Sequence, residues 1–525
     1  MTADLILAID QGTTNTKALL VDGSGRVVAS ASVEVPVAFP RPGWVESDAT
    51  RLWDTVAEAI ERVLADVETG RMAAVAIANQ RESVLVWERA TGRPLGPVVS
   101  WQCRRSTELC AAIRDDGAGA LVHARTGLTL DPMFSATKAR WLLDQVADGD
   151  RRAEAGELCV GTVDAWLTWN VSGGAAFVTD ATNASRTLLL DLDGLRWDPE
   201  LLLLFRIPAA ALPAVRASSG VVAETRALGR LPAGVPIAAL AGDSHAALVG
   251  HGFPGVGAVK ATFGTGTSVM APLAAGVRDD RLSATVAWAV ARGAAPDGAA
   301  DAAIDAVPAL EGNITATGAA LQWLAGIVGH AGRVGELETL AASVPDAGGA
   351  YLVPAFTGLG APHWDADARG LISGLSRGTT AAHLARAAFE SVGYQVRDVI
   401  DALAPAVGSP LTAVFADGGA MQSALLAQTT ADILGLPMLI NRAESLAALG
   451  AAYLAGLATG LWASTDEIRA LPRALDRFDP DPAAPAATEG YAGWQVALRR
   501  AAGDLGTAAS SAASTPTPAR TPVTA

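Results

Sequence analysis

A short polar segment near the N-terminus has the composition needed to hold phosphoryl groups. Asp10–Lys17 places Gly12 ahead of Thr13, Thr14 and Asn15 and ends on Lys17. A glycine lets the backbone turn sharply, so that amides and hydroxyls can surround phosphoryl oxygens. A lysine can neutralise their charge, and an aspartate can hold hydrated Mg²⁺. The spacing is not that of a Walker-type loop, and an ordinary polar hairpin is the alternative interpretation.

Glycine-rich loops recur later in the chain, at Gly264–Thr267 and at Asp417–Ala420. Taken alone, the first could be a flexible loop and the second a helix entry. Two adjacent glycines also permit close approach of a base or ribose, and a helix N-terminus adds partial positive charge. A phosphate loop in each half, followed by an adenosine loop, is the order found in actin-like ATPases.

A carboxylate that could act as a base follows the apolar run Pro236–Leu240, in the sequence Ala241–His245. A hydroxyl that attacks the γ-phosphorus must lose its proton, and Asp243 could accept it. The alternative is that Asp243 is a helix N-cap, since an Ala-rich helix is expected to follow. His245 is more simply interpreted as a packed helix residue than as a second base.

Two loops carry residues suited to a polyhydroxylated acceptor. Arg81 and Glu82 can donate to and accept from neighbouring hydroxyls, and Trp101 can cover a carbon skeleton. A surface ion pair and a core tryptophan are the alternative interpretation of these residues.

The elements that must position these residues alternate between strand and helix, which predicts an α/β fold. Leu5–Ile9 and Ala18–Val21 read as a hairpin, and apolar periodicity predicts a helix over Leu52–Val67. Further strands are predicted at Ala73–Ala78, Ala258–Phe263 and Leu411–Ala416, with helices at Gln422–Leu434 and Tyr491–Leu505.

The length of 525 residues predicts two large domains. Gly250–Val259 is rich in glycine and marks the boundary between them. We therefore expect an N-terminal lobe over 1–250 and a C-terminal lobe over 251–505. Residues 506–525 are rich in Ala, Ser, Thr and Pro and are expected to form a disordered tail.

Composition excludes several classes of protein. The net charge of −15 argues against a nucleic-acid partner. Three cysteines provide neither a disulfide framework nor a zinc site. The first residues lack a signal-peptide pattern and no apolar run could span a bilayer, so we expect no membrane insertion and a soluble cytoplasmic protein. Lysine is scarce and occurs at Lys17, Lys138 and Lys260.

With these motifs in order, the sequence resembles the FGGY carbohydrate kinases and, within them, the glycerol kinases. The resemblance runs from about Leu5 to about Leu505. The stretches that carry it are Ala8–Thr14, Pro42–Glu46, Asn79–Glu82, Trp101–Arg105, Thr126–Lys138, Gly161–Trp166, Thr182–Arg186, Pro354–Asp365 and Ala448–Gly456. Phe356–Asp365 resembles the glycerol-kinase signature of the family.

The resemblance implies two ribonuclease-H-like, actin-like lobes around an inter-lobe cleft, and ATP-dependent phosphorylation of a terminal hydroxyl of a small polyol, with glycerol first. It implies ATP and Mg²⁺ as cofactors, with Asp243 as the general base and Asp10 and Asp243 at the metal. Implied nucleotide contacts are Thr13, Thr14, Asn15, Lys17, Thr265, Gly318, Gln322, Gly419 and Ser423. Implied acceptor contacts are Thr13, Arg81, Glu82, Trp101, Met133, Asp243 and Ser244.

The departures from the glycerol-kinase pattern fall around the acceptor. Met133 replaces a tyrosine, Ser244 a glutamine and Ser268 a phenylalanine; near the nucleotide, Lys17 replaces an arginine and Ser423 an asparagine. A kinase for a four- or five-carbon polyol or ketose is therefore the first alternative. An actin-like ATP-binding switch without sugar chemistry is the second. A homodimer and a homotetramer both stay open.

Overall fold

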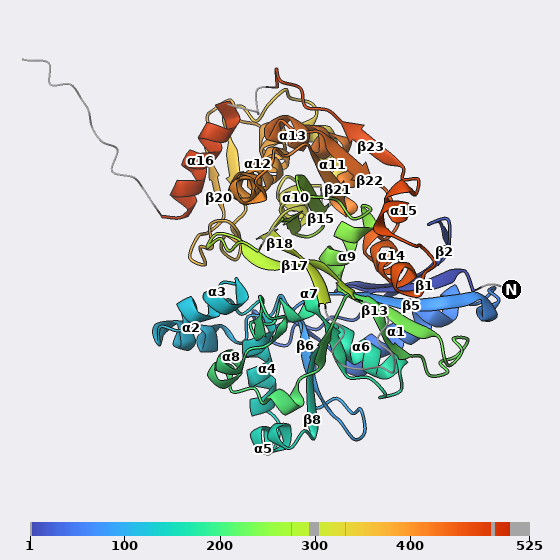
Figure 1. Ribbon diagram of the computed structural model, residues 1–525. Helices are drawn as coiled ribbons and strands as arrows, with labels where there is room; N and C mark the ends of the chain where they lie inside the picture. Colours follow the sequence, from blue (N-terminus) through green and yellow to red (C-terminus); the bar gives the residue numbers. More distant parts are fainter. Residues whose placement is uncertain (1–2, 275, 293–303, 331, 485–488, 504–525) are drawn as a thin grey trace, which may run out of the picture.

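The computed structural model describes residues 3–274, 276–292, 304–330, 332–484 and 489–503. Two lobes are stacked one above the other in Figure 1, with the edges of a large sheet running between them. The predicted tail at 506–525 lies outside the described residues.

One continuous sheet of thirteen strands runs through both lobes, in the order β23-β22-β21-β15-β16-β18-β17-β13-β14-β5-β1-β2-β3. The strands are β1 Leu5–Gln11, β2 Asn15–Asp22, β3 Val27–Glu34, β5 Met72–Asn79, β13 Ser219–Glu224, β14 Pro236–Gly242, β15 Ala258–Phe263, β16 Thr267–Pro272, β17 Ser283–Ala291, β18 Ile304–Ile314, β21 Ala413–Asp417, β22 Met438–Asn441 and β23 Leu475–Phe478. The two halves of the sheet meet where β13 pairs with β17 at Ser219 and Val290.

Each half of the sheet contains the same arrangement of four strands. In the first half β1 pairs antiparallel with β2 and parallel with β5, and β5 pairs parallel with β14. In the second half β15 pairs antiparallel with β16 and parallel with β21, and β21 pairs parallel with β22. The predicted recurrence of a strand–loop unit in both halves is thus confirmed as a repeated topology.

Most predicted elements are confirmed with small shifts of their ends. The predicted hairpin is β1–β2, and the strands predicted in each half are β5, β15 and β21. The helix predicted over Leu52–Val67 is α1, Ala49–Val63, so its predicted C-terminal end was wrong. The chain leaves the helix at Leu64 and turns, and Val67 packs against the core from outside the helix.

Helices cover the sheet on both faces. In the first half, α1 packs against β2 and β3 on one face, while α9 Asp243–Gly250 and α14 Leu446–Thr459 cover the other. Ile6 and Ala8 of β1 share a buried core with Ala448, Ala452 and other residues of α14. In the second half, α12 Ala381–Val407 packs with α13 Ala424–Leu434 and with α11 Val334–Ala341. A late segment of the chain therefore completes the core of the first lobe (Figure 1).

A smaller sheet forms the outer part of the first lobe. Its order is β4-β7-β6-β8, with bounds β4 Glu46–Ser47, β7 Val98–Val99, β6 Val84–Glu88 and β8 Leu158–Thr162. The remaining helices of this lobe are α2 Thr107–Asp115, α3 Gly119–Thr126, α4 Ser135–Asp144, α5 Gly149–Glu154, α6 Val163–Val171, α7 Ala181–Ala184 and α8 Pro199–Phe205. The C-terminal lobe adds α10 Gly318–Ile327, α15 Thr465–Ala470 and α16 Glu489–Ala501.

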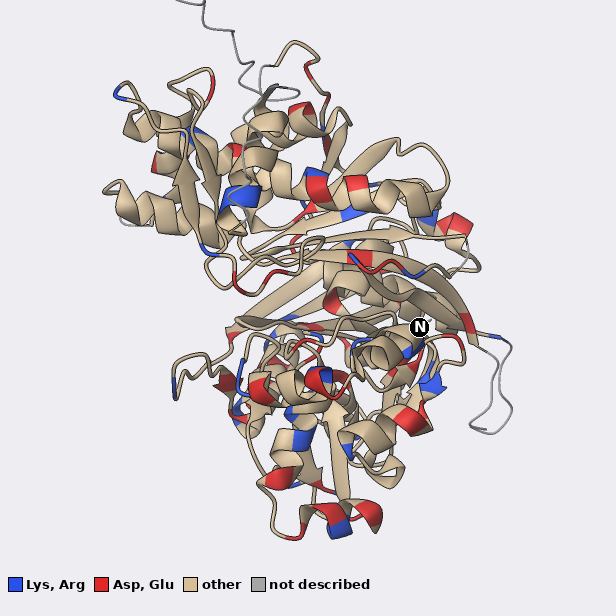
Figure 2. Ribbon diagram, turned by 90° about the vertical axis from the view of Figure 1, so that its left-hand side faces the viewer, with Lys and Arg blue, Asp and Glu red and all other residues tan. Residues whose placement is uncertain are grey.

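Lys and Arg are interspersed with Asp and Glu over both lobes rather than gathered into a basic stripe (Figure 2). Within the described part of the chain, no helix combines the length and the apolar character that crossing a membrane requires.

Candidate active site

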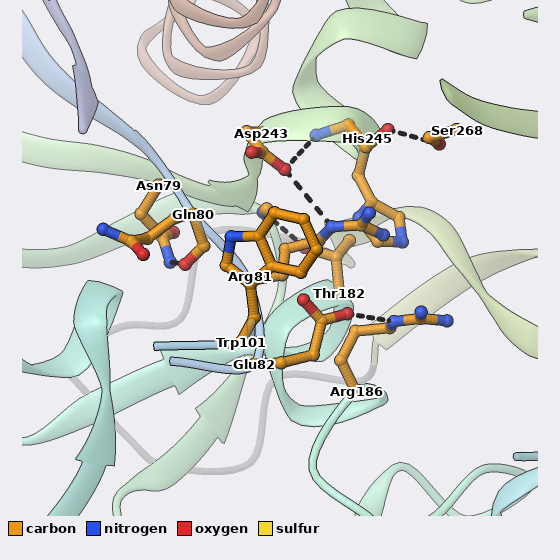
Figure 3. Close-up of polar contacts among 12 residues, drawn as sticks. Asn79, Gln80, Arg81, Glu82, Trp101, Thr182, Arg186, Asp243, His245 and Ser268 are labelled. Atoms are coloured by element: carbon orange, nitrogen blue, oxygen red, sulfur yellow. Dashed lines mark hydrogen bonds and ion pairs between the residues drawn. The ribbon is translucent and has the colours of Figure 1, made fainter. Parts of the chain in front are cut away.

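The candidate site lies where three parallel strands of the first lobe end. Gln11 of β1 pairs with Asn79 of β5, and Asn79 pairs with Gly242 of β14. The residues that follow each strand therefore meet at one edge of the sheet, the position at which open α/β sheets bind ligands. The Arg81–Glu82 loop and Asp243 come together for this reason (Figure 3), and the Asp10 loop follows the neighbouring strand β1.

Arg81 links the predicted base to the second lobe. Its Nε lies 3.2 Å from Asp243 Oδ1, and its Nη1 donates to Glu311 Oε2 at 2.8 Å. Only 8% of the Arg81 side chain is exposed. Burial opposes the charge, but Glu311, Glu82 and Asp243 together raise the pKa of Arg81 above its ordinary value. The guanidinium is therefore a fixed positive charge beside Asp243.

Glu311 and Arg186 are site residues that the sequence analysis did not single out. Arg186 Nε donates to Glu82 Oε1 at 2.7 Å, and its Nη2 lies 3.1 Å from Glu311 Oε2. Burial favours the neutral acid, but Arg81 and Arg186 hold the pKa of Glu311 well below its usual range. The two arginines and two glutamates form a buried ion network that crosses from one lobe to the other. Arg186 is the last residue of Thr182–Arg186, one of the stretches that carry the family resemblance, so the sequence did contain a signal for this residue.

Asp243 is the first residue of α9, and the N-cap of that helix is Gly242. Its Oδ1 accepts a hydrogen bond from the neighbouring Ser244 N at 2.6 Å, while 39% of the side chain stays exposed. Burial and then Glu82 raise the pKa of Asp243, against the lowering effect of Arg81. The carboxylate thus makes a local backbone contact and still presents an accessible surface.

His245 is fully buried, and its Nε2 lies 3.0 Å from Thr285 Oγ1. Burial lowers its pKa well below the ordinary value for histidine. It is placed as a packed neutral side chain of α9.

The residues predicted to contact the phosphoryl acceptor include Arg81, Glu82, Trp101, Asp243 and Ser244. Trp101 Nε1 donates to Thr13 Oγ1 at 3.0 Å, which connects the indole to the predicted first phosphate loop. Two contacts place Met133 near this group: Lys138 Nζ donates to the Met133 carbonyl oxygen, and the hydroxyl of Ser135, two residues on, donates to the carbonyl of Glu82. Met133 itself has a half-buried side chain.

The first phosphate loop is open to solvent. Thr14 and Asn15 are exposed, Thr13 is half-buried, and Gly12 N donates to Asn15 O at 2.9 Å to close the turn. Lys17 Nζ donates to the carbonyl of Glu444 at 3.0 Å. This loop therefore presents hydroxyls and amides with few side-chain partners of their own.

The second phosphate loop repeats this construction. Gly264 N donates to Gly266 O at 2.8 Å, and Thr265 is exposed at the tip. Gly318 begins α10 directly behind the loop, where an added Cβ would lie 2.6 Å from Gly264 O. No other residue fits at Gly318 without displacing the loop.

The remaining predicted nucleotide contacts lie apart from the acceptor group. Gln322 is exposed on α10, and Gly419 is exposed after β21. Ser423 is the N-cap of α13, where its hydroxyl accepts from Leu426 N at 3.0 Å. Gly418 has φ +100°, and a Cβ there would lie 2.3 Å from Phe263 O, which explains a glycine at that position.

Asp10 is the other predicted metal ligand. Ser445, another residue not singled out beforehand, donates to Asp10 Oδ2 at 2.7 Å. Burial raises the pKa of Asp10 to about 6, and Asp243 adds to this increase, whereas Ser445 and Lys17 oppose it. Among the described residues no group of three or more His, Cys, Asp or Glu could enclose a metal ion. Asp243 raises the pKa of Asp10, and carboxylates are the protein ligands that Mg²⁺ takes beside several waters and phosphates.

Comparison with known proteins identifies the family. The N-terminal domain of the FGGY family of carbohydrate kinases matches residues 5–250, and the C-terminal domain of that family matches residues 259–459. A glycerol kinase of Stenotrophomonas maltophilia is 46% identical over 502 residues, covering 95% of this chain and 98% of the relative. An apulose kinase of Pectobacterium atrosepticum is 44% identical over 504 residues, covering 95% and 99%.

A solved structure agrees with this result. Plasmodium falciparum glycerol kinase with ADP superposes with a TM-score of 0.85 at 27% identity, over 95% of this chain and 98% of the other. The two-lobed actin-like fold and the use of ATP follow from these likenesses. The chain therefore belongs to the FGGY family of carbohydrate kinases and is an ATP-dependent carbohydrate or polyol kinase.

Proposed function

We propose that the chain transfers the γ-phosphoryl group of ATP to a terminal hydroxyl of a small polyol, with Asp243 as the general base. The observation that carries this proposal is the pairing of Asp243 with Arg81 at the sheet edge that also holds the first phosphate loop. A pure ATP-binding switch has no need for this buried polar frame beside the loop.

In the proposed reaction, Arg81 and Glu82 orient the acceptor and Trp101 covers its carbon skeleton. Asp243 accepts the proton of the attacking hydroxyl, and its raised pKa makes it a better base than an ordinary aspartate. The side-chain and backbone donors around Thr13, Thr14, Asn15, Lys17 and Thr265 hold the phosphates, while Gly318, Gln322, Gly419 and Ser423 are proposed to bind the rest of the nucleotide. Most of the catalysis is positioning and charge stabilisation.

We include Mg²⁺ in this proposal, held through Asp10 and Asp243 and the nucleotide phosphates. The ion would neutralise charge on the transferred phosphoryl group. The fit rests on the two carboxylates, because Asp243 raises the pKa of Asp10 and a divalent cation would relieve that repulsion.

Glycerol is the first candidate acceptor, because the most similar relatives given above include a glycerol kinase. The other acceptor class, a four- or five-carbon polyol or ketose, is supported by Ser244 and Ser268, whose small side chains leave room for extra carbons. A relative of nearly equal similarity is named for apulose rather than glycerol. Met133, which cannot donate a hydrogen bond, supports the same alternative.

A panel of acceptors tests the function. ATP turnover should be stimulated by glycerol and by at least one four- or five-carbon polyol or ketose. The glycerol kcat/KM should exceed that of the best longer acceptor by less than about a hundredfold, or about 2.7 kcal/mol. A larger preference would establish narrow glycerol specificity, and stimulation by no acceptor would favour the ATP-binding switch. A cytoplasmic location, the lobe limits at 250 and 505 and the oligomeric state stay predictions.

A further inference from the structure

A closed ring of polar contacts surrounds the acceptor side of the site. We call it the polar ring; its members are Arg81, Asp243, Ser244, Ser268 and Glu311. Arg81 contacts both carboxylates, Ser244 N donates to Asp243 Oδ1, Ser244 Oγ donates to Ser268 Oγ at 2.6 Å, and Ser268 Oγ donates to Glu311 Oε1 at 2.6 Å. Figure 3 labels Arg81, Asp243 and Ser268 of this ring.

Lys260 and Glu311 contact the two serines from either side, and they determine the direction of the serine hydrogen bonds. Lys260, which is fully buried on β15, donates through Nζ to Ser244 Oγ at 2.6 Å. An ammonium can only donate and an ionised carboxylate can only accept. The order of donation is therefore Lys260 to Ser244, Ser244 to Ser268, and Ser268 to Glu311.

The charge states of both ends support this order. Burial lowers the pKa of Lys260 to about 8, which leaves the ammonium as the main form at neutral pH. Arg81 and Arg186 hold Glu311 ionised against the effect of its burial.

Each serine has consequently used its single proton within the ring. A hydroxyl offers one donor and two acceptor positions. Ser244 accepts from Lys260 and Ser268 accepts from Ser244, so each oxygen keeps one lone pair and neither keeps a proton. Ser268 is half-buried and is linked through Ser244 to Asp243, whose carboxylate is partly exposed, so this edge of the ring is its more accessible one.

We propose that Ser244 and Ser268 form a subsite that can accept hydrogen bonds from the substrate but cannot donate them. The subsite selects substrates that carry a hydroxyl group beyond the carbons held by Arg81 and Glu82, over substrates whose group at that position has no proton to donate. This inference rests on the proposed phosphoryl transfer to a polyol. Within the proposed class of phosphoryl acceptors, it favours polyols or ketoses longer than glycerol that carry a hydrogen-bond donor at the end away from the phosphorylated hydroxyl.

The test compares erythritol with two analogues of the same configuration, one terminally deoxygenated and one with fluorine in place of the far hydroxyl. Fluorine can accept weakly but cannot donate. The two ends of meso erythritol are mirror images that a chiral site distinguishes, so each analogue is assayed as both enantiomers. We expect kcat/KM for erythritol to exceed that of the better enantiomer of each analogue by about fivefold or more. An equal rate for the fluorinated analogue would overturn the inference.

Ser268→Ala provides the second arm. Ser244 then has a free proton, so the preference for erythritol over the fluorinated analogue should fall to about twofold or less. The melting temperature should fall, because Glu311 loses a donor, while the variant stays folded at the assay temperature. Ser391→Ala is the matched control, because Ser391 is a buried serine of the same lobe that donates to Ala388 O within α12, away from the site. An undiminished preference in Ser268→Ala would also overturn the inference.

The outcome separates this inference from the proposed function. If glycerol is phosphorylated but erythritol is not, or if the three acceptors react equally, the subsite assignment fails and the kinase assignment stands. If no acceptor in the series, glycerol included, stimulates ATP turnover, the proposed function itself fails.

Discussion

The proposed acceptor-binding side of the site is formed mainly by side chains, and the proposed nucleotide-binding side is formed mainly by backbone groups. Around Asp243, buried charged side chains of both lobes contact one another directly, through Arg81, Arg186 and Glu311. Around Thr14 and Thr265, exposed loops present backbone amides and hydroxyls behind which glycines pack closely. The acceptor side is thus preformed by side chains, whereas the nucleotide side is shaped by the backbone.

This difference indicates where sequence change alters function. A nucleotide loop depends on backbone geometry, so many side chains can vary while its glycines cannot. A preformed polar frame depends on every member being paired, because an unpaired buried charge is costly. Specificity for the acceptor should therefore change through neighbours of the frame, such as Ser244 and Ser268, while the frame itself stays constant.

The largest expected effect separates catalysis from nucleotide binding. Asp243→Asn should lower kcat by about 10²–10⁴-fold, because the amide cannot accept the proton of the acceptor hydroxyl. The affinity for ATP without Mg²⁺ should change little, since the proposed phosphate loops do not include this side chain; a loss of affinity seen only with Mg²⁺ would reflect its proposed role at the metal. Steady-state kinetics, nucleotide titration and melting temperature on the one variant measure all three quantities.

The competing interpretation of Asp243 as a helix cap makes the opposite prediction. Asparagine caps helices almost as well as aspartate, so an active and stable variant would remove Asp243 from the mechanism. The structure already assigns the N-cap position to Gly242.

The next effect concerns the stability of the acceptor side. Glu311→Gln should lower the free energy of unfolding by about 3–5 kcal/mol, because two buried arginines lose their shared counter-charge. Denaturant unfolding measures the change. Glu61→Gln is the control: Glu61 pairs with Arg230 at 3.0 Å where about half of each side chain is exposed, and its loss should cost less than about 1 kcal/mol. If Glu311→Gln and Glu61→Gln lowered the free energy of unfolding by equal amounts, this would contradict a preformed frame of charged side chains around Asp243.

A change on the nucleotide side should act on binding instead. Lys17→Met should raise the KM for ATP about tenfold or more, the worth of a hydrogen bond to a charged group, and leave unfolding almost unaffected. Lys17→Arg should retain most of the affinity, as it keeps the charge. A KM for ATP within about twofold of the unchanged protein in Lys17→Met would remove Lys17 from phosphate binding.

The last effect is a pH dependence of stability, which is gradual and small within any one pH unit. Burial lowers the pKa of Lys138 from 10.5 to about 7, although Glu82 opposes the shift. Between these values the unfolded chain binds a proton that the folded chain does not, so this group makes stability rise with pH. Relative to Lys138→Met, the unfolding free energy should increase by up to about 1.4 kcal/mol per pH unit from pH 7 towards pH 10. Parallel pH profiles for the two proteins would show that Lys138 does not titrate in this way.

Local sequence patterns were sufficient to predict the strand and loop units. β1, β5, β15 and β21 were predicted because each is an apolar run that ends at glycine or polar residues. The loops that follow them were predicted for the same reason. Periodicity failed at the end of α1, where Val67 packs on the core without continuing the helix, since an apolar residue can be buried in a turn as well as in a helix.

The partners across the lobes could not be predicted in this way. Glu311 lies in the middle of β18, with no motif around it, and its role depends on the pairing of β16 with β18 and on the approach of Arg81 from the other lobe. Ser445 contacts Asp10 although the two are 435 residues apart in sequence. Lys260 offered a weaker signal, as one of the few lysines of a chain that otherwise uses arginine.

The packing of α14 on the first lobe has a consequence for how the chain is made. β1 leaves the ribosome early, but the helix that covers Ile6 and Ala8 follows Ser445, which is 435 residues behind Asp10. At a translation rate of about 5–20 residues per second, the apolar face of β1 waits about 20–90 s for its cover. During synthesis this face of β1 therefore lacks the helix that covers it, and an N-terminal fragment ending at residue 250 would leave it without that helix.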